Sequence, residues 1–227
     1  MKKSILAILA YFVFTAIQAQ TYTGNLTLTT QAQVNAFAYT SVTGNLILHD
    51  GDITNLSPLS SLTTVGGDLQ IYNIYGLANL NGLSSLSSVG GNLWFNGNFL
   101  LSNLNGLSSL TTVGGDVQIW TNRGLLNLNG LSSLTSVGGK LFIQNNFVLS
   151  VFCGLYPLIN RGGVSGTYTV NGNALNPTEQ EIIDDGACPL PPVPLSNWAI
   201  YIGILLIAIF MFVAYRKRET RFSHNNL

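Results

Sequence analysis

The sequence predicts an all-β protein, a parallel β-solenoid with coils of 24 residues, followed by one C-terminal transmembrane helix. The first observation is a repeat, because Val-Gly-Gly recurs at equal intervals of 24 residues, beginning at Val65, Val89, Val113 and Val137. Equal spacing of this kind is typical of stacked repeat units. The second observation is that residues 195–215 carry no charge, and a run of this length can cross a bilayer.

The composition restricts the class of protein. Charged residues make up 8 % of the 227 residues and hydrophobic residues 47 %, whereas disorder needs low hydrophobicity and high net charge. Between Gln20 and Leu190, eight acidic residues stand against three basic ones. Nucleic acid requires a basic face. We therefore expect a chain that buries a core and has no nucleic-acid partner.

Residues 1–19 have the pattern of a secretory signal peptide. Lys2 and Lys3 precede an apolar run, and Ala19 is a small residue before a cut at Gln20. The alternative is an uncleaved N-terminal anchor, for which the apolar run is short. We expect the chain that follows to be exported.

Residues 195–215 are expected to form the transmembrane helix and residues 216–227 a basic cytoplasmic tail. The run is followed at once by Arg216, Lys217 and Arg218, and such clusters stay on the cytoplasmic side. A GPI-type signal normally ends within its hydrophobic stretch, and a core helix is the other alternative. The repeats are therefore expected outside the cell, held off the membrane by a proline-rich spacer at residues 189–194.

The residues after each Gly-Gly alternate between apolar and polar side chains, which predicts a half-buried strand. The members expected to point inward are Leu69, Ile71, Leu93, Phe95, Val117, Ile119, Leu141 and Ile143. The rest of each unit is too short and too rich in Ser, Thr and Gly for a stable helix, so turns and extended segments are expected there. Weaker copies at Gly24 and Gly44 predict shorter coils at the start.

Two asparagine columns repeat as regularly as the apolar residues. One consists of Asn55, Asn79, Asn103 and Asn127, and the other of Asn98, Asn122 and Asn146. In stacked coils each column would lie over itself at about 4.8 Å, so side-chain amides could bond one another and nearby turn backbone. A residue needed in every coil indicates a scaffold role rather than a binding site.

The repeat changes at residue 152, and residues 152–188 are expected to cap the domain that spans residues 20–188. Residues 167–170 predict a last strand, and Thr178 followed by Glu181 is a capping box that predicts a short helix. Such a cap would cover a strand edge that otherwise invites pairing between molecules.

Cys153 and Cys188 are the only cysteines and flank the cap. Because they lie in the part expected to be exported, we expect a disulfide between them. Two sulfurs without a nearby His do not favour a metal site. We expect no metal and no cofactor.

The exterior part contains one histidine, His49, as a candidate catalytic group. A triad would need His49 and a carboxylate to converge on one of the many repeated serines. His49, Asp50 and Asp52 could bind a cation weakly, although a solvated turn is the simpler interpretation. We therefore expect that the protein is not an enzyme, and a polysaccharide-active β-helix enzyme is the distant alternative.

The outward positions of the predicted strands carry large aromatic residues on four successive coils. They are Tyr72, Trp94, Trp120 and Phe142. An exposed aromatic patch favours a protein or glycan partner, while structural cover or self-association is the alternative, since β-sheet surfaces favour aromatic residues anyway. These four residues are the candidate ligand-binding residues.

The repeat over residues 40–188 resembles the receptor L-domain group of leucine-rich-repeat-like proteins, in units of the form L-x-x-L-x-G-L-x-x-L-x-x-V-G-G-x-L-x-I. The resemblance implies a right-handed parallel β-helix with a ligand-binding or adhesive role. The tail resembles bacterial sorting tails of the IPTL-CTERM and PEP-CTERM kind, through Pro194, Leu195, Ser196, Asn197 and Trp198. That resemblance implies processing by an exosortase-like membrane peptidase and transfer to the cell surface.

Together these patterns predict a noncatalytic, membrane-tethered surface protein that uses one face of the solenoid for adhesion or ligand binding. The alternative is a structural envelope component that associates with itself.

Overall fold

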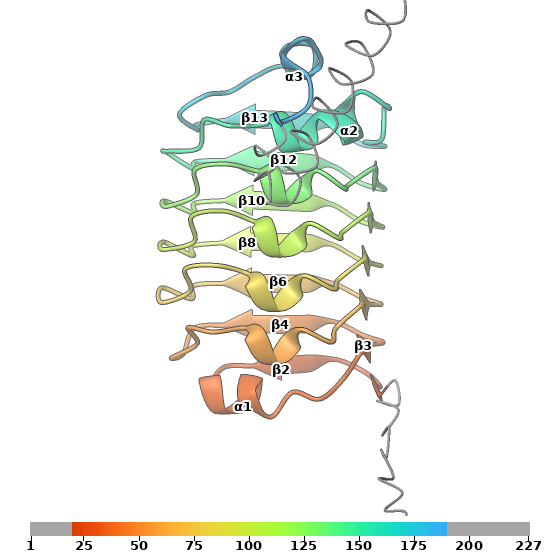
Figure 1. The fold of residues 1–227 in the computed structure, drawn as a ribbon, viewed down its shortest axis with the longest axis vertical. Helices are drawn as coiled ribbons and strands as arrows, with labels where there is room; N and C mark the ends of the chain where they lie inside the picture. Colours follow the sequence, from red (N-terminus) through yellow and green to blue (C-terminus); the bar gives the residue numbers. More distant parts are fainter. Residues whose placement is uncertain (1–19, 190–227) are drawn as a thin grey trace, which may run out of the picture. The chain divides into compact units, whose positions relative to one another are not determined.

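The computed structural model describes residues 20–189, which form two parallel β-sheets of repeating short strands (Figure 1). This arrangement is compatible with the predicted solenoid. The predicted signal peptide, the transmembrane helix, the tail that follows it and most of the spacer lie outside the described residues. Within residues 20–189, no helix has the length and apolar character needed to cross a membrane.

The larger sheet has seven parallel strands, one from each coil, in the order of the chain. Each strand pairs in register with the next, so Val117 lies opposite Leu93 on one side and Leu141 on the other. The strands are β2 (Leu26–Leu28), β4 (Leu46–His49), β6 (Leu69–Tyr72), β8 (Leu93–Asn96), β10 (Val117–Trp120), β12 (Leu141–Gln144) and β13 (Tyr168–Asn171).

The smaller sheet has six parallel strands of two residues each. They end at the valine that precedes Gly-Gly in the central repeats, and the glycines then turn the chain into the larger sheet. The strands are β1 (Thr21–Tyr22), β3 (Ser41–Val42), β5 (Thr64–Val65), β7 (Ser88–Val89), β9 (Thr112–Val113) and β11 (Ser136–Val137).

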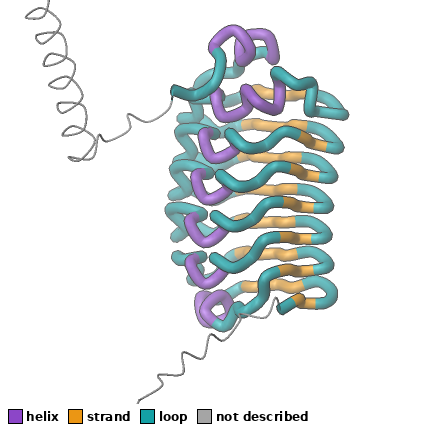
Figure 2. The backbone as a smooth tube through the Cα atoms, turned by 45° about the vertical axis from the view of Figure 1, so that its right-hand side comes forward, coloured by secondary structure: helices purple, strands orange, loops and turns teal. Residues whose placement is uncertain are grey.

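A short 3₁₀ helix completes the central coils where the sequence predicted only turns and extended chain. Figure 2 shows these helices stacked from coil to coil. A Cβ atom on Gly106 would collide with the carbonyl oxygen of Leu80 in the preceding coil, so the glycine permits this close stacking. The helices are η1 (Ser57–Leu59), η2 (Asn81–Leu83), η3 (Asn105–Leu107), η4 (Asn129–Leu131) and η5 (Cys153–Leu155).

The core lies between the sheets and the 3₁₀ helices, and it contains every strand residue predicted to point inward. Leu69, Ile71, Leu93, Phe95, Val117, Ile119, Leu141 and Ile143 are all fully buried. Full burial of such a side chain contributes about 1.5–3 kcal/mol relative to leaving it exposed. The alternation read from the sequence is therefore the pattern that builds the larger sheet.

The two asparagine columns make different hydrogen bonds. In the buried column, the Oδ1 of Asn122 accepts the backbone N–H of Asn98 in the preceding coil at 3.1 Å, and the Oδ1 of Asn146 accepts that of Asn122 at 2.9 Å. In the other column the bonds are local, because the Oδ1 of Asn79 accepts the N–H of Asn81, two residues on. The expected bonding between coils thus occurs in the buried column, while the other column holds the entry to each 3₁₀ helix.

The far end of the stack is closed by a strand, two helices and a disulfide. The helices are α2 (Tyr156–Ile159) and α3 (Glu179–Asp185), and Cys153 is bonded to Cys188 as the sequence predicted. The predicted capping box is formed, since Thr178 N–H donates to Glu181 Oε2 at 2.8 Å and Glu181 N–H donates to Thr178 Oγ1 at 3.2 Å. The N–H of Thr178, and then its hydroxyl, donate to the Glu181 carboxylate and hold the pKa of Glu181 below its usual range.

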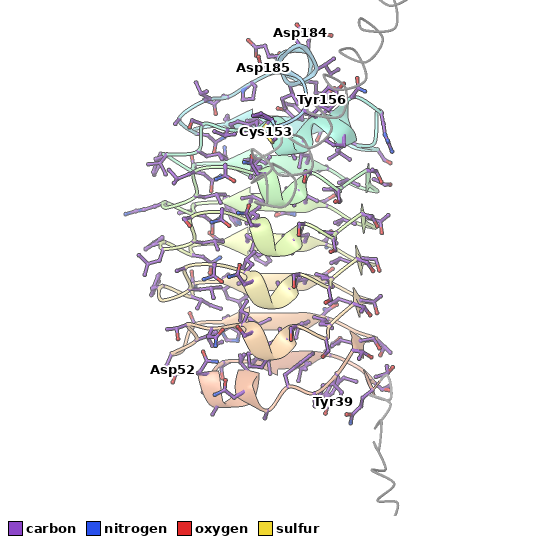
Figure 3. All side chains as sticks on the ribbon, viewed as in Figure 1. Tyr39, Asp52, Cys153, Tyr156, Asp184 and Asp185 are labelled. Carbon is purple, nitrogen blue, oxygen red and sulfur yellow. A yellow bond between two sulfur atoms is a disulfide. The ribbon has the colours of Figure 1, made fainter. Side chains whose placement is uncertain are left out.

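The first coil is closed by a helix that the sequence reading did not predict, α1 (Gln31–Asn35). It also begins with a capping box, between Thr30 and Gln33. Asp52 lies beside this helix (Figure 3), and its Oδ1 accepts the N–H of Gln31 at 2.8 Å. Val34 and Phe37 are buried against the core, so both ends of the apolar interior have a helix over them.

Candidate functional site

The outer face of the larger sheet carries the predicted aromatic residues on four adjacent strands. Tyr72, Trp94, Trp120 and Phe142 lie on β6, β8, β10 and β12, and all four are half-buried. The ring of His49 on β4 extends the series, since it stacks on Tyr72 at 5.0 Å between centroids and 4° between planes. We call these five residues the aromatic ladder.

Most rings of the aromatic ladder stack on one another. The centroids of Tyr72 and Trp94 are 5.7 Å apart, those of Trp94 and Trp120 are 6.2 Å apart, and the planes differ by 25° and 27°. Parallel rings at these separations are offset-stacked, so each middle ring has its faces partly covered by its neighbours. This part of the ladder stabilises itself and offers little free ring surface to a ligand.

The stacking ends between β10 and β12. Phe142 meets Trp120 edge to face, with an angle of 80° between the planes and 6.4 Å between the centroids. At this point the surface is hollowed into a pocket of about 280 Å³. The residues that line it are Asp116, Gln118, Trp120, Lys140 and Phe142. We call this hollow the β10–β12 pocket.

Two polar residues of the β10–β12 pocket, Asp116 and Lys140, belong to a third column of side chains. In this column the Oδ1 of one residue accepts the backbone N–H of its equivalent in the next coil, at 2.7 or 2.8 Å. Its acceptors are Asn25, Asn45, Asp68, Asn92 and Asp116. Lys140 holds the next position, and an ammonium cannot accept a hydrogen bond. The column therefore ends at the pocket.

The sequence reading missed Asp116, Gln118 and Lys140, although one signal was present. The column of Asn and Asp residues changes to a lysine at Lys140, and an aromatic residue, Phe142, lies two residues further on, opposite Gln118. A departure from an otherwise regular column marks the coil where the surface differs from the scaffold.

The indole nitrogens of the ladder are unusual. The Nε1 atoms of Trp94 and Trp120 are both buried and have no hydrogen-bond partner among the described residues. A buried indole N–H usually has one, and leaving it unmet costs about 1–3 kcal/mol.

The turn around His49 is organised by the fold. The Nδ1 of His49 lies 2.8 Å from Asp50 Oδ2, while the carboxylate of Asp52 is used by α1. These two carboxylates therefore have separate partners. Across residues 20–189, no three His, Cys, Asp or Glu side chains gather in a way that could hold a metal ion.

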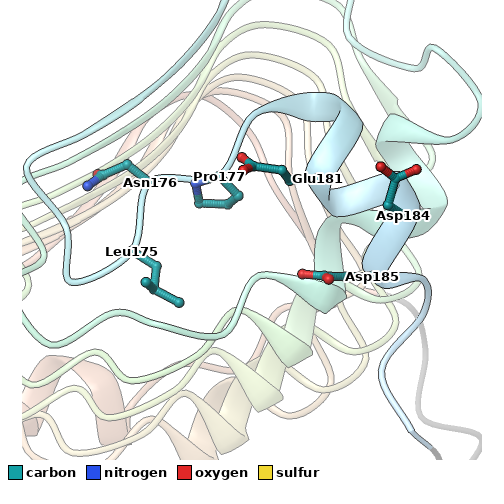
Figure 4. A pocket seen from close by; sticks show the side chains of 6 residues that line it. All are labelled: Leu175, Asn176, Pro177, Glu181, Asp184 and Asp185. Atoms are coloured by element: carbon teal, nitrogen blue, oxygen red, sulfur yellow. The ribbon is translucent and has the colours of Figure 1, made fainter.

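The cap contains two further hollows away from the aromatic ladder. One of about 360 Å³ is shown in Figure 4, where Glu181 and Asp184 on α3 and Leu175 on the preceding loop line it. The other, of about 700 Å³, lies along β13 and the segment 176–180. Burial, together with Glu179 and Glu181, raises the pKa of Tyr168, whose hydroxyl donates to the carbonyl of Pro177 at 2.6 Å. That tyrosine is a structural tie between β13 and the cap.

Comparisons with family models, with curated proteins and with solved structures find no match to this chain.

Proposed function

We propose that this chain is a noncatalytic surface protein that binds a ligand on the outer face of its larger sheet, at the β10–β12 pocket. The observation that carries the proposal is the break in the aromatic ladder, where Trp120 and Phe142 meet edge to face beside unlike polar groups. Ligand sites combine apolar walls with a few placed polar groups. Asp116 is engaged by the N–H of Lys140 and by Gln118, which supports a binding role over acid–base catalysis.

We further propose that the solenoid is a right-handed β-helix of the receptor L-domain kind, displayed at the cell surface. The support is the repeat over residues 40–188, the signal-like segment 1–19 and the uncharged run 195–215 with its basic end. An extracytoplasmic location also agrees with the disulfide between Cys153 and Cys188. Processing of the tail by an exosortase-like peptidase remains part of this proposal.

The experiment is a binding screen of the purified protein against glycans and whole cells, with three variants. Trp120→Ala removes a wall of the pocket, and we expect it to abolish binding. Trp94→Ala removes a ring of the self-stacked part, so a smaller loss is expected. Phe99→Ala is the matched control, because Phe99 is an exposed aromatic in a turn outside the sheet face. Equal binding by Trp120→Ala and the unmodified protein would refute the proposal.

A second candidate function is self-association, which a separate surface favours. Exposed apolar side chains occur at the turns that follow the strands of the larger sheet, in successive coils: Tyr75, Phe99, Leu100, Leu126, Phe147, Val148 and Val151. Tyr75 and Phe99 are in contact at 5.1 Å, and the guanidinium of Arg123 lies 4.9 Å from the centre of the Phe99 ring. Exposed apolar patches commonly mark interfaces. Loss of self-association in Phe99→Ala, with ligand binding unchanged, would assign the two functions to two surfaces.

A further inference from the structure

We infer that the ligand of the β10–β12 pocket is a glycan with carboxylate-bearing sugars, whose carboxylate binds Lys140 while a sugar ring lies against Trp120. The inference rests on the proposed function, because it names the ligand class of the same pocket. Its basis is the placement of one free cation beside the only point where the aromatic ladder changes from stacking to an edge-to-face contact.

The ammonium of Lys140 is available to a ligand. The backbone N–H of Lys140 continues the column by donating to Asp116 Oδ1 at 2.7 Å, and the backbone bond needs no lysine side chain. Among the described residues, no carboxylate lies within 4.0 Å of this ammonium. Lys140 is also exposed, so its charge is not used by the fold.

Among the described residues, Lys140 is the one cation that lies on this face of the larger sheet. The other two described cations are elsewhere, since Arg123 lies over Phe99 in a turn and Arg161 follows α2 in the cap. In a domain whose described charges are mainly acidic, a single unpaired lysine in an aromatic pocket selects for an anionic group. A carboxylate is matched by such a charge through charge-assisted hydrogen bonds.

The site favours a sugar over a peptide. On the face of a sheet, the backbone N–H and C=O groups are already paired between neighbouring strands, so an extended peptide finds no backbone partners there. Recognition must come from side chains. The pocket offers an indole and a phenyl ring for the apolar C–H surface of a sugar, and an amide from Gln118 for its hydroxyl groups.

Asp116 sets the orientation of the bound sugar. One oxygen of its carboxylate accepts the Lys140 N–H at 2.7 Å, and the other lies 3.4 Å from Gln118 Nε2. The negative charge of Asp116 repels a ligand carboxylate from that side of the pocket. Its carboxylate oxygens can instead accept hydrogen bonds from sugar hydroxyl groups. The ligand carboxylate is therefore directed toward the ammonium of Lys140.

The test uses polygalacturonate and its methyl ester, in which each carboxylate is replaced by a neutral ester, with chitosan as a cationic polymer. We expect the full-length protein to bind polygalacturonate about 2- to 5-fold more tightly than the ester, the range for an exposed ion pair. Raising the salt should reduce the difference, because exposed charges are screened.

Two substitutions separate this inference from the proposed function. Lys140→Gln should remove the preference for polygalacturonate, and the matched control Arg161→Gln should keep it. If the ester or chitosan binds as tightly as polygalacturonate while Trp120→Ala still abolishes binding, the inference is overturned and the proposed function stands. Failure to bind any of the three polymers overturns the inference as well, and whole-cell binding with Trp120→Ala then decides the proposed function by itself.

Discussion

The buried asparagine column predicts a large loss of stability for Asn122→Ala. Asn122 is fully buried, and its side chain makes bonds in both directions along the stack. Its Oδ1 accepts the backbone N–H of Asn98 at 3.1 Å, and its Nδ2 donates to the carbonyl oxygens of Phe95 and Trp120, both at 3.1 Å. The same Oδ1 also accepts from Asn98 Nδ2 at 3.2 Å, and the Nδ2 also donates to Asn146 Oδ1 in the next coil at 3.4 Å. Alanine removes all of these bonds and leaves a space in their place.

The size of the effect follows from the groups left behind. The N–H of Asn98 becomes a buried donor without a partner, which costs about 1–3 kcal/mol, and the weakened carbonyl bonds add about 1 kcal/mol. We expect a loss of about 2–4 kcal/mol in the free energy of unfolding. Asn79 is the matched control, since it is exposed and its Oδ1 accepts one N–H, that of Asn81, at 3.1 Å. Water can replace that bond, so Asn79→Ala should cost about 0.5–1.5 kcal/mol.

Equilibrium urea unfolding, followed by circular dichroism and tryptophan fluorescence, measures both variants. Hydrogen exchange at the amide of Asn98 adds a local measurement, because this N–H should lose its protection in Asn122→Ala and keep it in Asn79→Ala. Equal losses for the two variants, or a protected Asn98 amide in Asn122→Ala, would show that the column contributes no more than an ordinary surface turn.

Three further predictions concern the scaffold. Replacing both Cys153 and Cys188 by serine should lower the free energy of unfolding by about 2–4 kcal/mol, measured by urea unfolding, because the bridge closes a segment with a sequence separation of 35. Gly106→Ala should cost at least about 1–3 kcal/mol in the same assay, because its Cβ meets the carbonyl of Leu80 and the coils must separate. Acid should loosen α3: the lowered pKa of Glu181 stabilises the cap above the ordinary glutamate pKa of about 4.3, and this contribution is lost as the pH falls through the lowered value.

Each of the three has its own check. If Cys153→Ser alone and the double substitution leave stability unchanged, the bridge has no role in holding the cap. Gly24→Ala is the comparison for Gly106→Ala, since a Cβ at Gly24 meets no atom within 4 Å, although its φ of 97° is strained for alanine. If the Gly106 variant is not the less stable of the two, the collision between coils is not what destabilises it. For the cap, Glu181→Gln keeps a hydrogen-bond acceptor but cannot titrate. The protection of the α3 amides, corrected for the intrinsic pH dependence of exchange, should therefore fall less with acid in this variant than in the unmodified protein.

The periodic part of the fold could be predicted because each coil repeats the same sequence pattern of turn and strand. The spacing of Val-Gly-Gly and the period-two alternation located the strands of the larger sheet, and the residues predicted to point inward, such as Leu93 and Phe95, are fully buried. Repetition supports such predictions, because each coil tests the same assignment of strand and inward-facing residues. The capping box at Thr178 and the pairing of Cys153 with Cys188 were equally readable from local pattern.

The features that escaped prediction depend on contacts between coils or on short segments. The 3₁₀ helices contain three residues each, too few for a hydrophobic period, and they form because Asx side chains hold their entries and Gly permits close stacking. Helix α1 has a capping box at Thr30 and Gln33 that is visible in the sequence, but its five residues carry little amphipathic pattern. The hydrogen bonds of the Asn79 column could not be assigned either, because local and inter-coil bonds suit the same residue type.

In the candidate site too, the position of the residues could be predicted but the contacts between their side chains could not. Its aromatic residues could be placed on one face from their outward positions, but their relative orientation could not, since it depends on how each ring packs against the next coil. That orientation decides which rings are free: Tyr72 and Trp94 are held within the stack, and the junction of Trp120 and Phe142 opens a pocket.

In a solenoid, the residues that break a column are the best guide to function. A residue that recurs in every coil contributes the same bond or contact each time, so it serves the stack as a whole. Lys140 interrupts a column of hydrogen-bond acceptors, and Phe142 replaces the glutamine found in the preceding coil at Gln118. Neither change improves the stack, because lysine cannot accept the bond that the column requires, and Phe142 ends the ring stacking. Lys140 immediately precedes β12, Phe142 lies within it, and both line the same pocket. The loss of an acceptor and of ring stacking at this one coil is better explained by a ligand than by the scaffold.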